Sequence, residues 1–331
     1  MKKHHRIFGS IIIFGLMFMS VLAQSASAPE TSDDPSESTP QNALTYSQSA
    51  VLGVIEGLTE YLPVSSTGHL ILADYFFDRS SDVTSNPAEL DTSRAARNAY
   101  LIVIQGGAIL AVLLIYWKKV LGILMGLLGR NPQGLALGLK VLVAFIPAAL
   151  VGPFLNDLIE AKLFNPVSVC IALVLGAVVM IVVEKRRTPR DSSTDGHTTP
   201  SHKTMEDLSY REALMIGVAQ CFAMWPGMSR SMVTIVGGYL AGLEARAAAE
   251  FSFLLGLVTL SAASCYSLLK SGSAIVEQIN MGPALFGILV ATVVAFLAVK
   301  WFVGFLTRHG MLVFAIYRLI LAAAILWLCS M

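Results

Sequence analysis

The sequence contains two polar stretches inside long apolar surroundings. They read Glu56-Gly-Leu-Thr-Glu60-Tyr-Leu-Pro63-Val-Ser65-Ser66-Thr67-Gly-His69 and Gln220-Cys-Phe-Ala-Met-Trp-Pro226-Gly227-Met-Ser229-Arg230-Ser231-Met-Val-Thr234. A charged side chain at the centre of a membrane helix costs about 2.5–3.5 kcal/mol on insertion scales, and such residues usually mark a pathway or a reaction site. These two stretches are therefore the first guide to fold and function.

The composition is that of an integral membrane protein. The chain has 331 residues, of which 55% are hydrophobic and 14% are charged, whereas soluble domains carry about 25% charged residues. A formal net charge of +1, with no basic run interleaved with aromatic residues, gives no indication of a nucleic-acid partner. The four cysteines stand singly in apolar stretches without metal-type spacing, which indicates small core residues.

Six apolar segments are long enough to span a bilayer, which requires roughly 20 residues. They are Tyr100–Trp117, Leu139–Leu158, Pro166–Val183, Ala249–Leu269, Gly282–Val303 and Met311–Cys329. The sequence thus predicts an all-α polytopic membrane protein with about six transmembrane helices.

Two further apolar stretches, Ser47–Phe77 and Arg211–Leu243, are interrupted by Pro63 and by Pro226-Gly227. Proline removes a helix donor and clashes with the preceding turn, so each stretch is expected to form two half-helices that meet at a turn. We interpret them as re-entrant helical hairpins. The alternative is that each forms one kinked span.

The basic residues support the hairpin interpretation. They gather in three connections: Lys118, Lys119, Arg130 and Lys140; Lys185, Arg186, Arg187, Arg190 and Lys203; and Lys300 with Arg308. The positive-inside rule makes these connections cytoplasmic. Only two non-crossing hairpins place all three on one side, and both chain ends and the polar insert Asp78–Arg97 then lie outside.

The two hairpins also align with each other. Gly53 matches Gly217, and Ser65-Ser66-Thr67 matches Ser229-Arg230-Ser231, at the same offset of 164 residues. Each hairpin is followed by three spanning segments, and the two hairpins enter from opposite sides. This is the pattern of an inverted-topology repeat, which places a site near the membrane midplane.

The expected organisation has five parts. Residues 1–28 resemble a signal peptide, with a basic start, an apolar middle and a small-residue cleavage site, and residues 29–46 form a polar, disordered external segment. A first repeat covers residues 47–184, a basic cytoplasmic linker residues 185–210, and a second repeat residues 211–331. Removal of residues 1–28 and their retention as an extra helix both remain open, as does the oligomeric state, a homodimer included.

Glu56 and Glu60 are candidate catalytic residues. They are four residues apart and therefore share one helix face. Two carboxylates in an apolar setting cannot both stay ionised without help, so either one keeps a proton or a cation bridges them. The pair is thus a candidate metal site. A purely structural hydrogen bond to a neighbouring helix is the alternative.

The residues after Pro63 suit an anion. Ser65, Ser66 and Thr67 stand at the expected start of the second half-helix, where hydroxyls cap free N–H groups and the helix N-terminus attracts negative charge. His69 lies about one turn beyond Ser66 and is a candidate acid or base. Simple capping, and a helix–helix hydrogen bond from His69, are the structural alternatives.

In the second hairpin, Arg230 carries the decisive charge. Its planar guanidinium suits bidentate contact with phosphate oxygens, and Ser229, Ser231 and Thr234 add hydroxyl donors. A structural ion pair with Glu56 or Glu60 is the alternative. Together the hairpins supply an anion cradle, two carboxylates, a hydroxyl nucleophile and a proton carrier, which fits phosphoryl transfer.

These stretches resemble the two signature motifs of the undecaprenyl-diphosphatase family, the bacitracin-resistance proteins. The first is E-x-x-x-E running into P-V-S-S-T-G-H, at Glu56 to His69, and the second is P-G-x-S-R-S-x-x-T, at Pro226 to Thr234. Phe314-Ala-Ile-Tyr317-Arg318 is also typical of the family. The resemblance implies hydrolysis of undecaprenyl diphosphate to the monophosphate and inorganic phosphate, recycling of the lipid carrier of cell-wall synthesis in the bacterial inner membrane, bacitracin resistance, and a divalent cation such as Mg²⁺ or Ca²⁺.

The resulting hypothesis is that Arg230 and Ser229 hold the diphosphate, which enters from the outer face, while a cation on Glu56 and Glu60 neutralises charge. Ser66 attacks the terminal phosphorus with His69 or Glu60 as proton carrier; direct attack by water is the variant. There are two rival interpretations. A lipid-carrier flippase shares the inverted repeat, and a type-2 phosphatidic-acid phosphatase would need a second His–Asp pair that does not follow Arg230.

Overall fold

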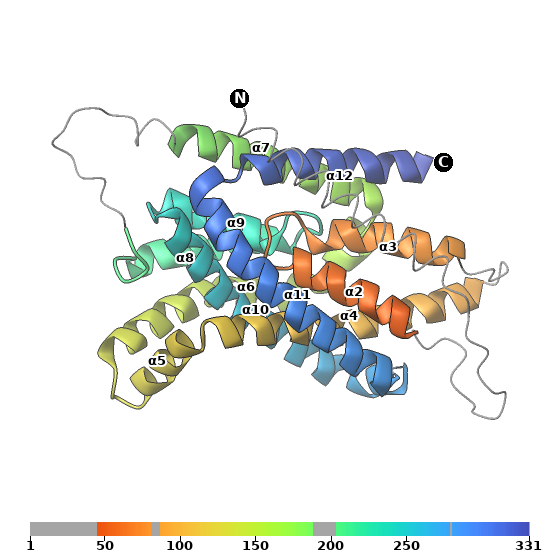
Figure 1. The fold of residues 1–331 in the computed structure, drawn as a ribbon, viewed down its shortest axis with the longest axis horizontal. Helices are drawn as coiled ribbons and strands as arrows, with labels where there is room; N and C mark the ends of the chain where they lie inside the picture. Colours follow the sequence, from red (N-terminus) through yellow and green to blue (C-terminus); the bar gives the residue numbers. More distant parts are fainter. Residues whose placement is uncertain (1–44, 81–86, 188–202, 279, 331) are drawn as a thin grey trace.

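The structure, a computed structural model, describes residues 45–80, 87–187, 203–278 and 280–330, and this part of the chain is helical (Figure 1). The signal-peptide-like segment, the polar segment as far as residue 44, residues 81–86 of the outer insert and residues 188–202 of the basic linker lie outside the described residues. The helices are α2 Tyr46–Thr59, α3 Ser66–Ser80, α4 Pro87–Ile115, α5 Trp117–Leu127, α6 Pro132–Leu163, α7 Pro166–Arg187, α8 Tyr210–Cys221, α9 Arg230–Leu240, α10 Ala245–Gln278, α11 Met281–His309 and α12 Leu312–Ser330.

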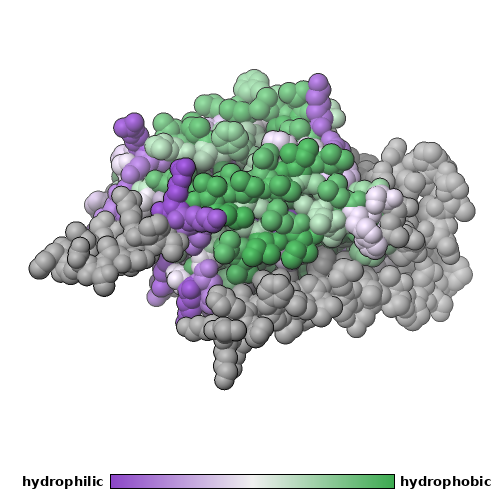
Figure 2. Space-filling model, turned by 90° about the horizontal axis from the view of Figure 1, so that it is seen from above, coloured by the Kyte–Doolittle hydropathy of each residue, from purple (hydrophilic) through white to green (hydrophobic). Residues whose placement is uncertain are grey.

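The spanning helices agree with the prediction. Among the described residues, five helices are long and apolar enough to cross a membrane, and the bent pair α4–α5 makes a sixth if it is counted as one span. Figure 2 shows a broad band of hydrophobic side chains across the middle of one face, with hydrophilic side chains gathered toward one end. The predicted all-α, multi-pass membrane fold is therefore confirmed.

Both interrupted stretches form helix–turn–helix units. The breaks lie between α2 and α3 and between α8 and α9, where a short 3₁₀ turn, Phe222–Met224, precedes the tip. With 14 residues in α2 and 11 in α9, these half-helices reach about 21 Å and 16 Å, short of the roughly 30 Å hydrocarbon core. The halves of each unit also contact each other. These observations favour re-entrant hairpins over single kinked spans.

The two halves of the chain pack in a reciprocal way. Helix α2 of the first hairpin packs mainly on α11, and α8 of the second hairpin packs mainly on α6. The last helices of the two halves, α7 and α12, pack on each other, while α3 contacts α12 and α9 contacts α7. Each hairpin is thus held by the other half, which is the pairing that an inverted repeat requires.

Glycines make this packing close. A Cβ at Gly53 would lie 2.7 Å from the carbonyl oxygen of Gly287 on α11, and one at Gly57 would lie 2.7 Å from that of Ala291. The matching glycine of the second hairpin, Gly217, meets the backbone of Ala144 on α6 in the same way. Small residues of this kind let backbones approach in membrane bundles.

The region around α5 differs from the prediction. The expected span Tyr100–Trp117 is part of a longer helix that runs from Pro87 to Ile115, and the chain then bends by 80° into α5. Lys118 and Lys119 lie in α5 and Lys140 lies in α6, so the prediction of one connecting loop was wrong.

Ion pairing explains how these lysines fit into helices. The Nζ atom of Lys119 is 2.6 Å from a carboxylate oxygen of Glu250 on α10, which fastens α5 to the bundle. Lys140 is buried and donates to the main-chain carbonyl of Glu206 at 2.7 Å. Because such partners come from distant segments, a run of cations in the sequence does not by itself distinguish a loop from a helix.

The last part of the linker fastens the base of the second hairpin. Lys203 Nζ is 2.6 Å from Glu212 of α8, and the N–H of Glu244 donates to the carbonyl of Lys203 at 3.1 Å. Both the start of α8 and the chain following α9 are therefore bound to one short segment.

We expect Gly217→Val to lower the stability of the protein by about 1–3 kcal/mol, because the added side chain overpacks the contact between α8 and α6. The measurement is the melting temperature of the purified protein in detergent. Gly106→Ala is the matched control, because a Cβ there meets nothing within 4 Å, and it should melt at or above the wild-type temperature. Equal melting of both variants would contradict the close packing.

Candidate functional site

The tips of the two hairpins have the same unusual backbone. Ser65 has φ 75° and Ser229 has φ 72°, and among the described residues these are the non-glycine residues with positive φ. They occupy matching positions, 164 residues apart. Each hydroxyl then accepts from an N–H three residues on, Ser65 from Gly68 and Ser229 from Met232, both at 3.4 Å. Such conformations cost about 1–3 kcal/mol and cluster at functional sites. Their presence at both tips indicates that the two tips belong to one functional site.

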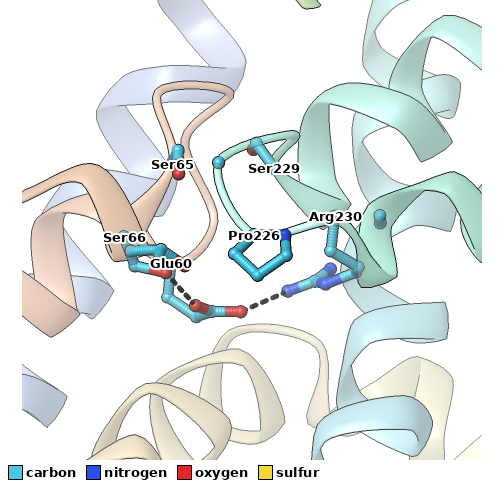
Figure 3. A pocket seen from close by; sticks show the side chains of 9 residues that line it. Glu60, Ser65, Ser66, Pro226, Ser229 and Arg230 are labelled. Carbon is cyan, nitrogen blue, oxygen red and sulfur yellow. Dashed lines mark hydrogen bonds and ion pairs between the residues drawn. The ribbon is translucent and has the colours of Figure 1, made fainter. Parts of the chain in front are cut away.

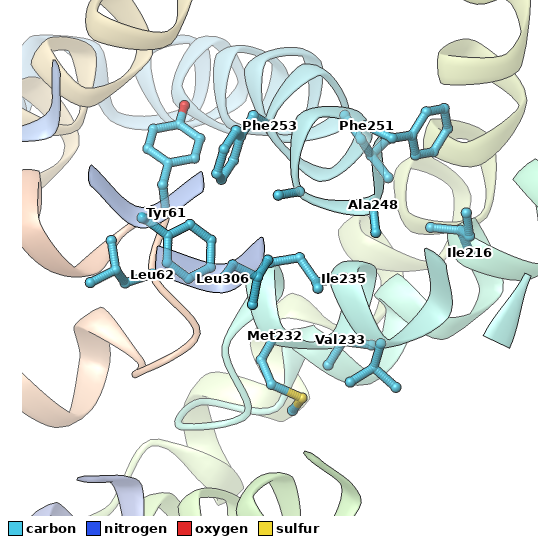
Figure 4. Packing of buried hydrophobic residues seen from close by; sticks show 14 of the residues in the cluster. Tyr61, Leu62, Ile216, Met232, Val233, Ile235, Ala248, Phe251, Phe253 and Leu306 are labelled. Carbon is cyan, nitrogen blue, oxygen red and sulfur yellow. The ribbon is translucent and has the colours of Figure 1, made fainter. Parts of the chain in front are cut away.

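The tips bind each other directly. The hydroxyl of Ser231 donates to the main-chain carbonyl of Leu62, on the opposite tip, at 2.8 Å. Leu62 and Met232 lie in the same apolar cluster beside this contact (Figure 4). Thr234, one turn along α9, donates to the carbonyl of Arg230 at 2.9 Å and shares a 2.6 Å hydrogen bond with the hydroxyl of Ser252 on α10. Ser231 and Thr234 therefore hold the second tip in place.

A buried arginine on α12 fastens both tips from behind. Arg318 is 0% exposed. Its guanidinium donates to the main-chain carbonyls of Ala172 at 3.1 Å, Leu173 at 3.2 Å, Gly227 at 2.9 Å and Pro63 at 3.5 Å. Pro63 belongs to the first tip, Gly227 to the second, and the other two to α7. Backbone groups freed by the helix breaks thus find a donor inside the protein, as the membrane requires.

In front of the tips, Glu60 joins the two hairpins (Figure 3). One carboxylate oxygen accepts from the hydroxyl of Ser66 at 3.1 Å, and the other accepts from the Nη2 atom of Arg230 at 3.1 Å. The side chains of Glu60 and Arg230 are only 9% and 10% exposed. An acid, a hydroxyl and a cation from both halves of the chain therefore form one connected group.

Helix α10 positions the guanidinium of Arg230. Its Nη1 atom donates to the carbonyl of Ser252 at 3.1 Å, and the group lies against Gly256, where no side chain intervenes. Its carbon atom also lies 5.1 Å from the centre of the Tyr61 ring. Ring and helix together hold the charge at the edge of the pocket.

A pocket lies between the tips. Its walls are formed by Glu60, Ser65, Ser66, Thr67, Ala223, Pro226, Gly227, Ser229 and Arg230. In Figure 3, Ser65 and Ser229 face each other across the space above the Glu60–Arg230 pair. The pocket therefore brings together six of the predicted site residues. The other four, Glu56, His69, Ser231 and Thr234, do not line it.

Glu56 lies one helical turn behind Glu60 on α2 and is buried. Within the described residues, no group of three or more His, Cys, Asp or Glu side chains is arranged to hold a metal ion. Mg²⁺, however, is commonly bound by one or two carboxylates together with substrate phosphates. Glu60 in the pocket wall, with Glu56 behind it, fits that kind of site, and a cation there stays a prediction.

His69 faces away from the pocket. Its Nδ1 atom is 2.7 Å from the carbonyl oxygen of Ser65, and its Nε2 atom is 2.6 Å from the hydroxyl of Tyr317, whose ring stacks on it. A carbonyl oxygen only accepts, so Nδ1 carries a proton and the neutral ring accepts from Tyr317 at Nε2. Acting as acid or base would require one of these bonds to break. In this arrangement His69 supports the strained Ser65.

Sequence reasoning did not assign a role to Arg318 or Tyr317, although both stand in a quoted motif. The signal was available: Arg318 is a lone cation near the middle of an apolar span, and such a residue marks a functional position. Ser252 offered no comparable signal, because its partners come from the second hairpin.

A multi-pass helical protein in which two half-helix tips surround one carboxylate, four hydroxyls and an arginine belongs to the class of membrane proteins with an embedded pocket suited to an anion. Residues 49–324 match the family described as "Bacitracin resistance protein BacA". The chain belongs to this family.

Relatives from several bacteria agree with this assignment. An undecaprenyl-diphosphatase of Sorangium cellulosum is 43% identical over 281 residues, covering 84% of both chains. One of Clostridium tetani is 38% identical over 276 residues, covering 83% of this chain and 93% of its own. One of Acinetobacter baumannii is 39% identical over 277 residues, covering 83% and 92%.

Replacing Arg318 by methionine should strongly destabilise the tips. The substitution removes the donor to the carbonyls of Pro63 and Gly227 at the two tips, and an unsatisfied buried group costs about 1–3 kcal/mol. We expect a clear fall in melting temperature and loss of turnover, with Arg318→Lys intermediate because an ammonium cannot span the same carbonyls. A methionine variant that melts and turns over like wild type would disprove the fastening role.

The position of His69 predicts that it does not set the pH dependence of turnover. His69→Gln should lose activity through the displaced first tip, yet the surviving activity should follow the wild-type pH profile between about pH 5 and 8, where histidine titrates. The measurement is kcat/KM against pH for both proteins. If wild type shows a pH-dependent change of kcat/KM in this range and the variant does not, His69 is an acid or base after all.

Proposed function

We propose that this protein is an undecaprenyl-diphosphate phosphatase, which hydrolyses the diphosphate to undecaprenyl phosphate and inorganic phosphate. The observation that carries the proposal is the position of Glu60 between the Ser66 hydroxyl and the Arg230 guanidinium, 3.1 Å from each. Family membership and the names of the relatives support it. They do not favour the polyprenyl-phosphate flippase.

Arg230 binds the diphosphate by exchanging one anion for another. Without substrate, Nη2 of Arg230 is paired with Glu60. A planar guanidinium prefers bidentate contact with phosphate oxygens, so a diphosphate that enters between the tips competes with the carboxylate. Ser65, Thr67 and Ser229 line the same space, and the N-termini of α3 and α9 favour negative charge. Release from Arg230 leaves Glu60 a better proton acceptor.

Ser66 is placed as the nucleophile. Its oxygen attacks the terminal phosphorus while its proton passes to Glu60, to which it already donates. The bond from that phosphorus to the bridging oxygen breaks, and undecaprenyl phosphate leaves with the bridging oxygen, to which Glu60 passes the proton it took from Ser66, so that Glu60 is ionised again. Water then attacks the phosphoserine and gives its proton to Glu60, and the Ser66 oxygen leaves and takes a proton back. Direct attack by a water activated by Glu60 is the variant.

A divalent cation is the proposed cofactor. Glu60, with Glu56 one turn behind it, would hold Mg²⁺ or Ca²⁺ together with phosphate oxygens. When bound, it would neutralise charge on the transferring phosphoryl group. The protein residues still bind, orient and move the proton as described.

We propose that the protein lies in the bacterial cytoplasmic membrane and that its pocket opens to the outer side. Recycling the lipid carrier supports cell-wall synthesis. Because bacitracin sequesters the diphosphate, its hydrolysis would also confer resistance.

The decisive measurement is phosphate release from undecaprenyl diphosphate by purified protein, with and without a chelator. Wild type should release phosphate and Arg230→Ala should lose at least about 100-fold in kcat/KM, because a charge-assisted clamp is worth several kcal/mol in such a site. Chelation should abolish the activity and added Mg²⁺ or Ca²⁺ should restore it. Wild-type protein that releases no phosphate would overturn the proposal.

Ser66→Ala separates the two chemical routes. If Ser66 is the nucleophile, rapid quenching of wild type traps a phosphoserine and the alanine variant has no measurable turnover. Absence of a phosphoserine, with substantial activity left in the variant, would instead establish direct attack by water.

A further inference from the structure

Of the four unsatisfied side-chain polar atoms in the described part of the chain, one belongs to Arg230, one to the Tyr61 ring beside it, and one to Gln220, which contacts the same helix α10 as Arg230. The four buried side-chain atoms without a hydrogen-bond partner are Tyr61 Oη, Gln220 Nε2, Arg230 Nε and Tyr239 Oη. Tyr61 lies beneath the Arg230 guanidinium, and Gln220 is linked to it through α10. A buried donor left unpaired costs about 1–3 kcal/mol, so this grouping calls for an acceptor.

Helix α10 places the amide of Gln220 beside the guanidinium. The hydroxyl of Thr259 donates to the carbonyl of Leu255 at 2.8 Å and lies 3.4 Å from Gln220 Oε1, while Arg230 lies against Gly256. Gly256 and Thr259 are three residues apart on one helix face, about 4.5 Å along the axis. Two unpaired N–H donors therefore lie about one turn apart on the same side of α10.

The second hairpin places the same amide next to the pocket. Gln220 is 2% exposed and precedes Ala223 by three residues, so it lies one turn behind a residue that lines the cavity. Gln220 also occupies the position that matches Glu56 in the first hairpin, at the offset of 164 residues. One hairpin thus places a carboxylate behind the pocket, and the other places an amide donor.

We propose that Gln220 is a further ligand-binding residue of the pocket. Its Nε2–H donates, beside the Nε–H of Arg230, to an oxygen atom that belongs to a bound phosphate or to a water held next to it. This inference rests on the proposed function for its substrate. The phosphate and the water each supply the acceptor oxygen that the N–H groups require.

The test uses Gln220→Met, which keeps the length of the side chain and removes the amide. Inorganic pyrophosphate serves as a probe of binding and undecaprenyl diphosphate as the substrate. We expect a smaller rise in melting temperature with pyrophosphate than in wild type and at least a tenfold loss in kcat/KM. A raised KM and weaker inhibition by phosphate identify a phosphate oxygen, whereas a lower kcat with unchanged KM identifies a water.

Tyr239→Phe is the matched control. It removes another unpartnered buried atom, at the far end of α9 beneath Arg187, and should leave kcat, KM and the pyrophosphate shift unchanged. Gln220→Leu repeats the test if the methionine variant does not fold. Wild-type kcat, KM and pyrophosphate shift in either folded variant would overturn the inference. Failure of wild type to release phosphate would contradict the proposed reaction. The rise in melting temperature with pyrophosphate would still test the role of Gln220.

Discussion

The structure depends on the bonding of one buried guanidinium to four main-chain carbonyls. A helix that breaks inside a bilayer frees backbone groups for which the lipid offers no partner. Arg318 supplies donors to both breaks and to α7 at once. The buried guanidinium thus finds acceptors, and the carbonyls at the two breaks find a donor. Because the tips share this cation, they cannot move independently.

Duplication then gives an asymmetric site from symmetric parts. Both tips have a strained serine, a capped half-helix and a close glycine contact with the opposite half of the chain. The chemistry differs: the first hairpin brings Glu60 and Ser66, and the second brings Arg230. An acid and a cation are complementary only when both tips meet. The reciprocal packing of α2 on α11 and α8 on α6 is what makes them meet.

Much of this could be predicted from the sequence, because the signals are local. Proline marked both breaks, hydropathy marked the spans, and polar side chains marked the pocket, six of whose lining residues were named. What could not be predicted depends on distant partners. Whether Lys119 belongs to a loop or a helix depends on Glu250, and the orientation of His69 depends on Tyr317. Spacing also placed Glu56 and Glu60 on one face, yet only Glu60 lines the cavity.

The charge balance of the pocket connects the geometry to the proposed cofactor. Glu60 and Arg230 neutralise each other before substrate binds, which limits the cost of burying either. A diphosphate adds at least two negative charges to this nearly neutral site, in which Glu60 already balances the charge of Arg230. In a poorly solvated pocket the excess would be expensive, because interactions between charges are stronger there than in water. This charge balance is the reason for proposing that a divalent cation enters with the substrate, whatever the route of phosphoryl transfer.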